Sequence, residues 1–321
     1  MAWDIRNLLV NKYKISHDKI IPFYVYAKRE LWDVKIRNYN AENIKGLIFG
    51  NSNAAYGFLE KELTIPFLNL SVPSQDLYYE YNVFLKCLKK YGRKLKNLEY
   101  IVIDLYDYIE FNIDCSLSKN ILNYLYCGGI YEEHNYFKNL NYSKSLNEEL
   151  FEKHKILKKN NFDDVMDDLF IDWSLKNILD VDNRWNHIEY NEPLSGALLT
   201  AGIVENIFDD TIKENKKILY NFLKTIRTWS PEIKVIFTLI PRYITMEKAT
   251  EKILEPWKHD FFRTINMFCE FFKISFFNYK HRTEISMNHM FYWDIEHMNT
   301  IGGRALSAIL NEDIKGLKVL N

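Results

Sequence analysis

The sequence predicts an α/β protein built on a doubly wound, five-stranded parallel sheet with a largely helical insertion. Five short apolar runs alternate with longer segments in which apolar residues recur at helical spacing. Continuous apolar runs are typical of parallel strands, because helices cover both faces of such a sheet. The alternation of strand and helix in five rounds favours parallel pairing throughout. The strands are expected at 46–50, 67–70, 100–105, 234–240 and 274–279.

The chain divides into a short leader and one large domain. Residues 1–43 carry apolar residues scattered among charges, and we expect a helical leader packed on the core. Residues 44–321 are expected to form a single α/β domain. We find no internal repeat and no low-complexity linker in it.

Short helices are expected between the first three strands. The first strand leads through a Gly-Asn-Ser turn into a short helix over 53–62. After the second strand, Ser74 is a candidate N-cap for a helix over about 75–91, because a serine hydroxyl can accept a first-turn N–H. The third strand is a run of β-branched and apolar residues, which favours a buried position in the sheet.

A long segment, about 112–208, separates the third strand from the fourth. We expect it to be mostly helical and to form a cap over the carboxyl edge of the sheet. Seven aspartates lie between 163 and 182 with a single lysine among them. Such a cluster could hold a metal, but a solvated helical face is the favoured interpretation, and we predict no metal site. The side chains of the insertion that could line a substrate site are Trp173, Trp185, His187 and Tyr190.

The C-terminal half repeats the strand and helix alternation. An amphipathic helix is expected over 209–229, where Pro231 marks its end. The fourth strand is followed by a loop, a long helix over about 248–272 and the fifth strand. A final helix over about 300–312 completes the domain.

Two motifs at opposite ends of the chain carry candidate chemistry. Asp294 precedes His297 by three residues, with Asn299 and Gly302 at fixed offsets after it. A carboxylate at that distance can hold the proton on one imidazole nitrogen, which leaves the other nitrogen free to act as a base. Ser52 follows the first strand and the histidine follows the fifth. Because carboxyl ends of parallel strands meet at one edge, the two can meet there.

Together these motifs resemble the SGNH (GDSL-type) hydrolases, over roughly residues 44–110 and 230–312. The resemblance implies a flavodoxin-like strand order, 2-1-3-4-5, and a catalytic triad of Ser52, His297 and Asp294. The turn here reads Gly50-Asn51-Ser52 in place of Gly-Asp-Ser. It is more similar to the branch that acylates or deacylates surface polysaccharides than to the secreted lipases.

The resemblance also implies an oxyanion hole. The residues that would supply its donors match the family's sequence blocks less well than the triad does. The candidates are the Ser52 N–H, Asn51, and Ser74 or Ser71, since the family's glycine of the second block has no counterpart. The Gly-x-Asn-Asp of the third block is also missing, so another group completes the hole or it has only two donors. The candidate substrate contacts outside the insertion are Asn53, Tyr106, Arg242 and Tyr243.

The function that follows is a serine-dependent acyl-ester hydrolase or O-acyltransferase that works through an acyl-enzyme. The resemblance implies an acetylated carbohydrate or a surface-polysaccharide precursor as substrate, and no cofactor. A catalytically inactive relative that binds a glycan or a partner is the alternative. A phosphate-binding turn at residues 50–52 is disfavoured, because the chain has neither Gly-x-Gly-x-x-Gly nor a P-loop lysine.

The composition of the chain limits the kinds of binding partner and indicates the cellular compartment. The net charge of −1 and the lack of a strongly basic run argue against a nucleic-acid surface. The four cysteines are widely separated and are expected to be free thiols in a reducing compartment. Neither a signal peptide nor an apolar run of membrane-spanning length is evident, so we expect a cytoplasmic protein.

Overall fold

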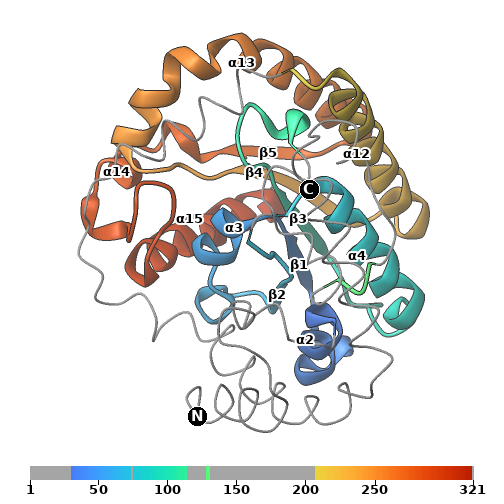
Figure 1. Ribbon diagram of the computed structural model, residues 1–321. Helices are drawn as coiled ribbons and strands as arrows, with labels where there is room; N and C mark the ends of the chain where they lie inside the picture. Colours follow the sequence, from blue (N-terminus) through green and yellow to red (C-terminus); the bar gives the residue numbers. More distant parts are fainter. Residues whose placement is uncertain (1–29, 74, 114–127, 131–206, 320–321) are drawn as a thin grey trace, which may run out of the picture.

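Five parallel strands form one sheet in the order β2-β1-β3-β4-β5 (Figure 1). The computed structural model describes residues 30–73, 75–113, 128–130 and 207–319. The strands are β1 (Gly46–Phe49), β2 (Phe67–Asn69), β3 (Tyr100–Asp104), β4 (Lys234–Leu239) and β5 (Ser275–Asn278). The predicted fold class and strand order are confirmed, and each strand lies within a residue or two of its expected bounds.

The register of the strands sets the level at which each strand ends and its following loop begins. Phe49 pairs with Ile103, Ile103 with Phe237, and Phe237 with Phe276. This row runs across four strands, so the segments that follow β1, β3, β4 and β5 begin at nearly the same level. Side chains on those segments are therefore brought together at one edge.

Helices cover both faces of the sheet (Figure 1). Ile48, Val102 and Ile236 pack in one apolar cluster with residues of α15 (Thr300–Val319), beside α3 (Ser52–Gly57). The strand residues that alternate with them face α4 (Leu77–Tyr91), α12 (Asp209–Trp229) and the C-terminal half of α13 (Ile244–Phe272). This alternation explains the continuous apolar runs in the sequence, since each strand is buried on both sides.

Shorter elements complete the described chain. Helix α2 (Leu31–Tyr39) packs through Leu31, Trp32 and Ile36 against the cluster that contains α4 and α12. The remaining short helices are η3 (Ala41–Asn43), η4 (Glu60–Glu62), η5 (Glu110–Asn112), η6 (Tyr279–His281), α14 (Thr283–Ser286) and η7 (His289–Phe291).

Four helix boundaries differ from those expected. Helix α3 ends at Gly57 and not at 62, and the separate short helix η4 follows it. Helix α4 is capped by Asp76, whose carboxylate accepts the Tyr79 N–H at 2.9 Å, so the proposed cap at Ser74 was wrong. Helix α13 begins at Ile244 and not at 248. Helix α15 continues to Val319, because Ile314 extends its buried stripe beyond the expected end at 312.

Several expectations fall on residues that the structure does not describe. Almost all of the expected cap at about 112–208 is among them, including the acidic stretch 163–182. So are Ser74, Trp173, Trp185, His187 and Tyr190. In the part of the chain that is described, no helix combines the length and apolarity needed to cross a bilayer. The two described cysteines, Cys87 and Cys269, are free thiols.

Candidate active site

Ser52, His297 and Asp294 form a hydrogen-bonded chain. The Ser52 Oγ lies 2.8 Å from His297 Nε2. On the other side of the ring, His297 Nδ1 lies 2.8 Å and 3.0 Å from the two carboxylate oxygens of Asp294. A base within reach of a hydroxyl, itself held by a carboxylate, is the arrangement that nucleophilic catalysis by serine requires.

The turn after β1 presents Ser52 as the first residue of α3. The Asn51 side chain caps this helix by accepting the Asn53 N–H at 2.9 Å. Gly50 has φ +155, and a Cβ there would lie 2.7 Å from Ala54 Cβ and 2.9 Å from Asp104 Cβ. Glycine is therefore required at this position, because the turn packs directly against α3 and the end of β3.

The loop that carries His297 is organised by Asp294. One carboxylate oxygen of Asp294 accepts the N–H groups of Glu296 and His297, each at 2.7 Å. The Trp293 N–H in turn donates to the His297 carbonyl at 3.1 Å. The three-residue spacing thus lets one carboxylate bind both the backbone and the ring of His297, which fixes the imidazole in orientation.

Aromatic rings enclose the imidazole. The Trp293 ring stacks on that of His297, with centroids 5.4 Å apart and planes 24° from parallel. Tyr56 of α3 meets the same ring edge to face at 5.6 Å. These contacts restrict ring rotation and reduce the exposure of His297 to solvent.

Asn299 and Gly302 join the triad loop to α15. The Asn299 side-chain oxygen accepts the N–H groups of Ile301 and Gly302, and the side-chain amide nitrogen donates to the Met290 carbonyl at 2.8 Å. A Cβ at Gly302 would lie 2.2 Å from the Phe291 carbonyl oxygen. The motif positions after His297 are therefore explained by capping and by close backbone approach.

Asn69, at the end of β2, was not singled out from the sequence. Its buried amide donates to the carbonyls of Ala54 and Phe58 at 2.8 and 2.9 Å, and its oxygen accepts the Ser71 N–H at 3.0 Å. It thereby holds the C-terminal part of α3, the helix that begins with Ser52. An isolated asparagine at a strand end carries no distinguishing signal, so only the fold could identify it.

The candidate oxyanion donors differ in whether their hydrogen-bonding groups are already engaged. Asn51 serves as a helix cap, and Ser74 lies outside the described residues. The Ser71 N–H is taken by Asn69, whereas its hydroxyl is buried and has no partner. The Asn53 side chain is 3% exposed, and neither its amide nitrogen nor its oxygen has a partner. Buried polar atoms without partners are uncommon in folded proteins and mark groups available to a ligand or water.

The other candidate substrate contacts lie along the same edge with different exposure. Tyr106 and Tyr243 are half-buried, and the Tyr243 ring packs on Tyr292 at 5.6 Å. Arg242 is fully buried, with its guanidinium paired to Asp107. Because Arg242 is buried in an ion pair, its role is structural, and the expected direct contact with substrate is not supported.

Three carboxyl groups, those of Glu80, Asp104 and Glu110, are buried near one another, and Asp104 lies beside Gly50 of the nucleophile turn. Burial, reinforced by neighbouring carboxylates, raises the pKa of Glu110 to about 8 from 4.5. Burial likewise raises the pKa values of Glu80 and Asp104 well above their usual range. Asp104 accepts a hydrogen bond from the Thr238 hydroxyl at 2.6 Å. Burial and the neighbouring carboxylates therefore favour the protonated forms of these three acids.

Among the described residues, no group of three or more His, Cys, Asp or Glu side chains has the arrangement of a metal site. No family model matches the sequence, and no curated protein or solved structure matches it either.

Proposed function

We propose that this protein is a serine-dependent acyl-ester hydrolase or O-acyltransferase. The observation that carries the proposal is the chain of contacts from Ser52 through His297 to Asp294, with all three links at 2.8–3.0 Å. Each residue alone has ordinary structural explanations, but the three in this order have a well-defined chemical use.

The reaction would proceed in two acyl transfers. His297 Nε2 takes the Ser52 proton as Oγ forms a bond to the acyl carbonyl carbon, and then delivers that proton to the departing alcohol oxygen. The acyl group is left as an ester on Ser52. In the second transfer, water or an acceptor hydroxyl gives its proton to His297, attacks the ester and releases Ser52. Asp294 holds the ring and stabilises the imidazolium in both halves.

The developing oxyanion needs hydrogen-bond donors close to Ser52. The Ser52 N–H is one, since the first residue of a helix has no acceptor inside the helix. We propose the Asn53 amide and the Ser71 hydroxyl as further candidates, because both are buried and lack a partner. They replace Asn51 and the Ser71 backbone N–H, which are engaged in holding the turn.

The substrate class rests on resemblance alone. The similarity to polysaccharide-modifying SGNH proteins favours an acetylated carbohydrate or a surface-polysaccharide precursor. A cytoplasmic location and the absence of a nucleic-acid partner are likewise proposals from the sequence.

Labelling with a fluorophosphonate tests the proposal. We expect the full-length chain to be modified at Ser52, and Ser52→Ala to remain unlabelled while keeping its melting temperature. Turnover of a small aryl acetate should follow the same pattern. If the folded wild-type chain is neither labelled nor active, the inactive binding protein becomes the better interpretation.

A further inference from the structure

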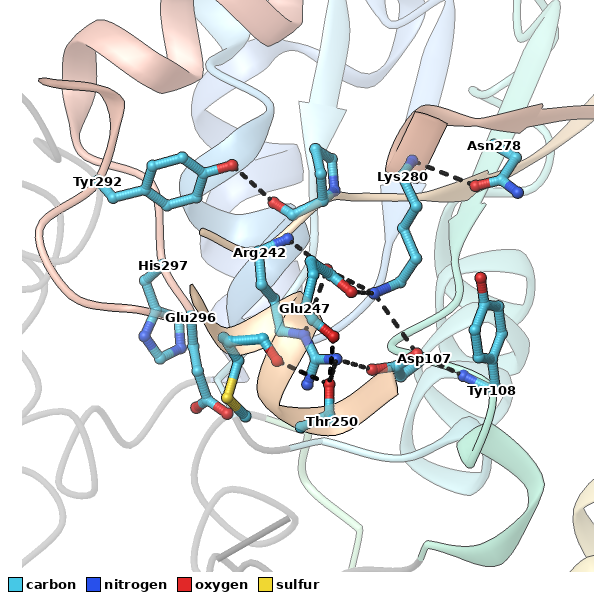
Figure 2. Close-up of polar contacts among 12 residues, drawn as sticks. Asp107, Tyr108, Arg242, Glu247, Thr250, Asn278, Lys280, Tyr292, Glu296 and His297 are labelled. Carbon is cyan, nitrogen blue, oxygen red and sulfur yellow. Dashed lines mark hydrogen bonds and ion pairs between the residues drawn. The ribbon is translucent and has the colours of Figure 1, made fainter. Parts of the chain in front are cut away.

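Four charged side chains form a buried ion cluster beside the His297 loop: Asp107, Arg242, Glu247 and Lys280 (Figure 2). Arg242 pairs with Asp107, and both side chains are fully buried. Lys280 Nζ lies 2.6 and 2.7 Å from the two carboxylate oxygens of Glu247. With two anions and two cations, the ion cluster is neutral as a set.

The ion cluster joins three loops at the carboxyl edge of the sheet. Asp107 follows β3, Arg242 follows β4, and Lys280 lies in η6 directly after β5. Glu247, in the first turn of α13, accepts the Arg242 backbone N–H at 2.9 Å. The lysine and the arginine together lower the Glu247 pKa to about 2. The ion cluster therefore fixes the backbone at Arg242 as well as its side chain.

The two neighbours of Arg242 contact the triad loop directly. The Tyr292 hydroxyl donates to the Pro241 carbonyl at 3.0 Å. The Tyr243 N–H donates to the Ile295 carbonyl, also at 3.0 Å. These contacts lie on either side of Asp294. In the view of Figure 2, Arg242 lies between Glu296 and His297 on one side and Asp107 and Lys280 on the other.

Buried ion pairs contribute little net stability, because desolvation offsets most of their attraction. Their better-attested role is to specify one arrangement of the groups that they join. Here the ion cluster would specify the backbone conformation of residues 241–243. This segment makes two hydrogen bonds to the loop of Asp294 and His297. The placement of the imidazole against Ser52 depends on that conformation.

We propose that Arg242 and the ion cluster are positioning residues for His297, which deepens the proposed acyl-transfer function and rests on it. Arg242 acts through the backbone of residues 241 and 243, and it does not touch the reacting atoms. Shifting a catalytic group by about 1 Å can reduce a rate by roughly 10²-fold. Loss of the ion cluster should therefore lower kcat for an aryl acetate by about 10- to 100-fold with little change in KM.

Two variants test the ion cluster. Arg242→Met removes one cation and leaves the buried Asp107 with only the more distant Lys280, at 3.5 Å, among the cations of the cluster, so it risks poor folding. Asp107→Asn combined with Arg242→Met removes one charge of each sign and keeps the Glu247–Lys280 pair. Rates are taken per folded molecule, with the folded fraction measured by circular dichroism. We expect the double variant to fold and to show the loss in kcat.

Arg227 provides a matched control. Its guanidinium also joins separate elements, donating to the Phe272 carbonyl at 2.9 Å and to the Ile233 carbonyl, but at the amino edge of the sheet. Arg227→Met should lower the melting temperature and leave kcat unchanged. An equal loss of kcat in Arg227→Met would mean that general destabilisation, and not positioning, explains the effect.

The decisive readout is coupling to His297. If Arg242 acts through the imidazole, adding the Asp107→Asn and Arg242→Met changes to His297→Ala should reduce the residual rate by less than about 2-fold. If instead the loss from the cluster changes and the loss from His297→Ala multiply in the combined variant, the positioning role is overturned. Labelling of the wild type separates the two proposals: an unlabelled wild type rejects the acyl-transfer function itself. A labelled wild type with a folded, equally reactive cluster variant rejects the positioning role alone.

Discussion

Ser52 and His297 are separated by 245 positions in the sequence, and their side-chain atoms lie 2.8 Å apart. The packing of α3 on α15 produces this contact. A Cβ at Gly303 would lie 2.5 Å from the Tyr56 carbonyl, and the Leu59 N–H donates to the Ser307 hydroxyl at 2.9 Å. Close approach of the two helices sets the nucleophile against the base.

Substitutions in the triad should abolish activity without unfolding the protein. We expect Ser52→Ala and His297→Ala each to lower kcat by roughly 10⁴-fold or more, and the double variant to be little worse, because the two act as one unit. Asp294→Asn should cost a similar factor or less. The measurement is aryl acetate turnover, with a melting curve on each sample.

The Asp294 variant carries a second expectation. Its carboxylate also binds the backbone N–H groups of Glu296 and His297. An asparagine oxygen can accept those bonds, so the loop should stay in place and the loss should lie in kcat. A large rise in KM would contradict this assignment.

The two glycines Gly302 and Gly316 of α15 should respond in opposite ways to alanine. At Gly302 a Cβ would meet the Phe291 carbonyl oxygen at 2.2 Å, whereas at Gly316 it would meet nothing within 4 Å. Gly302→Ala should therefore displace the triad loop, lowering both the melting temperature and kcat. Gly316→Ala should stabilise the protein by up to about 1 kcal/mol through helix propensity and leave activity unchanged. Equal effects of both changes on kcat would exclude a special role for Gly302.

Alanine substitutions at Asn53 and Asn51 should have different effects on activity and on stability. The Asn53 amide is buried without a partner, so Asn53→Ala should leave the free energy of unfolding unchanged or raise it by up to about 1 kcal/mol. If the amide stabilises the oxyanion, kcat should fall by roughly 10²-fold. Urea unfolding and aryl acetate kinetics on the same samples check both.

Asn51→Ala is the matched comparison. It removes the cap of α3 and should lower the free energy of unfolding by about 1 kcal/mol. A variant at Asn53 that loses stability but retains full kcat would show that its amide is structural.

Stability should fall as pH rises from about 5 to 8. The pKa of Glu110 is about 8 in the folded protein, against an ordinary value of 4.5, chiefly because the group is buried. Between these values the folded state holds a proton that the unfolded state has released. Unfolding is therefore favoured by raising the pH, with a slope of about 1.4 kcal/mol per unit for one such group. Glu80 and Asp104, whose pKa values are also raised, act in the same direction.

Glu110→Gln isolates one of these groups. Glutamine is neutral at every pH and can still accept the Tyr106 N–H that Glu110 accepts at 2.7 Å. In urea unfolding at pH 5, 6, 7 and 8, the variant should show a shallower fall in the free energy of unfolding. Curves parallel to those of the wild type would mean that Glu110 is ionised in the folded state. Glu247 contributes in the opposite sense: its lowered pKa adds stability above pH 4.5, which is lost as the pH falls towards 2.

The sheet was predictable because its signal is local. Residues 46–49 and 100–103 are apolar on both sides, and short continuous runs of this kind are typical of central parallel strands. The amphipathic helix at 209–229 was predicted at its observed bounds for the same reason. Ser52, Asp294 and His297 were identified from two short motifs and their resemblance to the SGNH hydrolases, and the shared edge of parallel strands explained how they could meet.

The sequence by itself determined the order of strands and helices along the chain, because that order depends on short-range periodicity. It also indicated which residues could form a triad, through two short motifs and their resemblance to a known family. Only the tertiary structure decided how those residues are held. The place of Arg242 in a buried ion cluster depends on Asp107, Glu247 and Lys280, which lie in three separate segments. The role of Asn69 depends on carbonyls 11 and 15 residues away. Such contacts arise when loops meet at one edge of the sheet, and no local pattern in the chain records them.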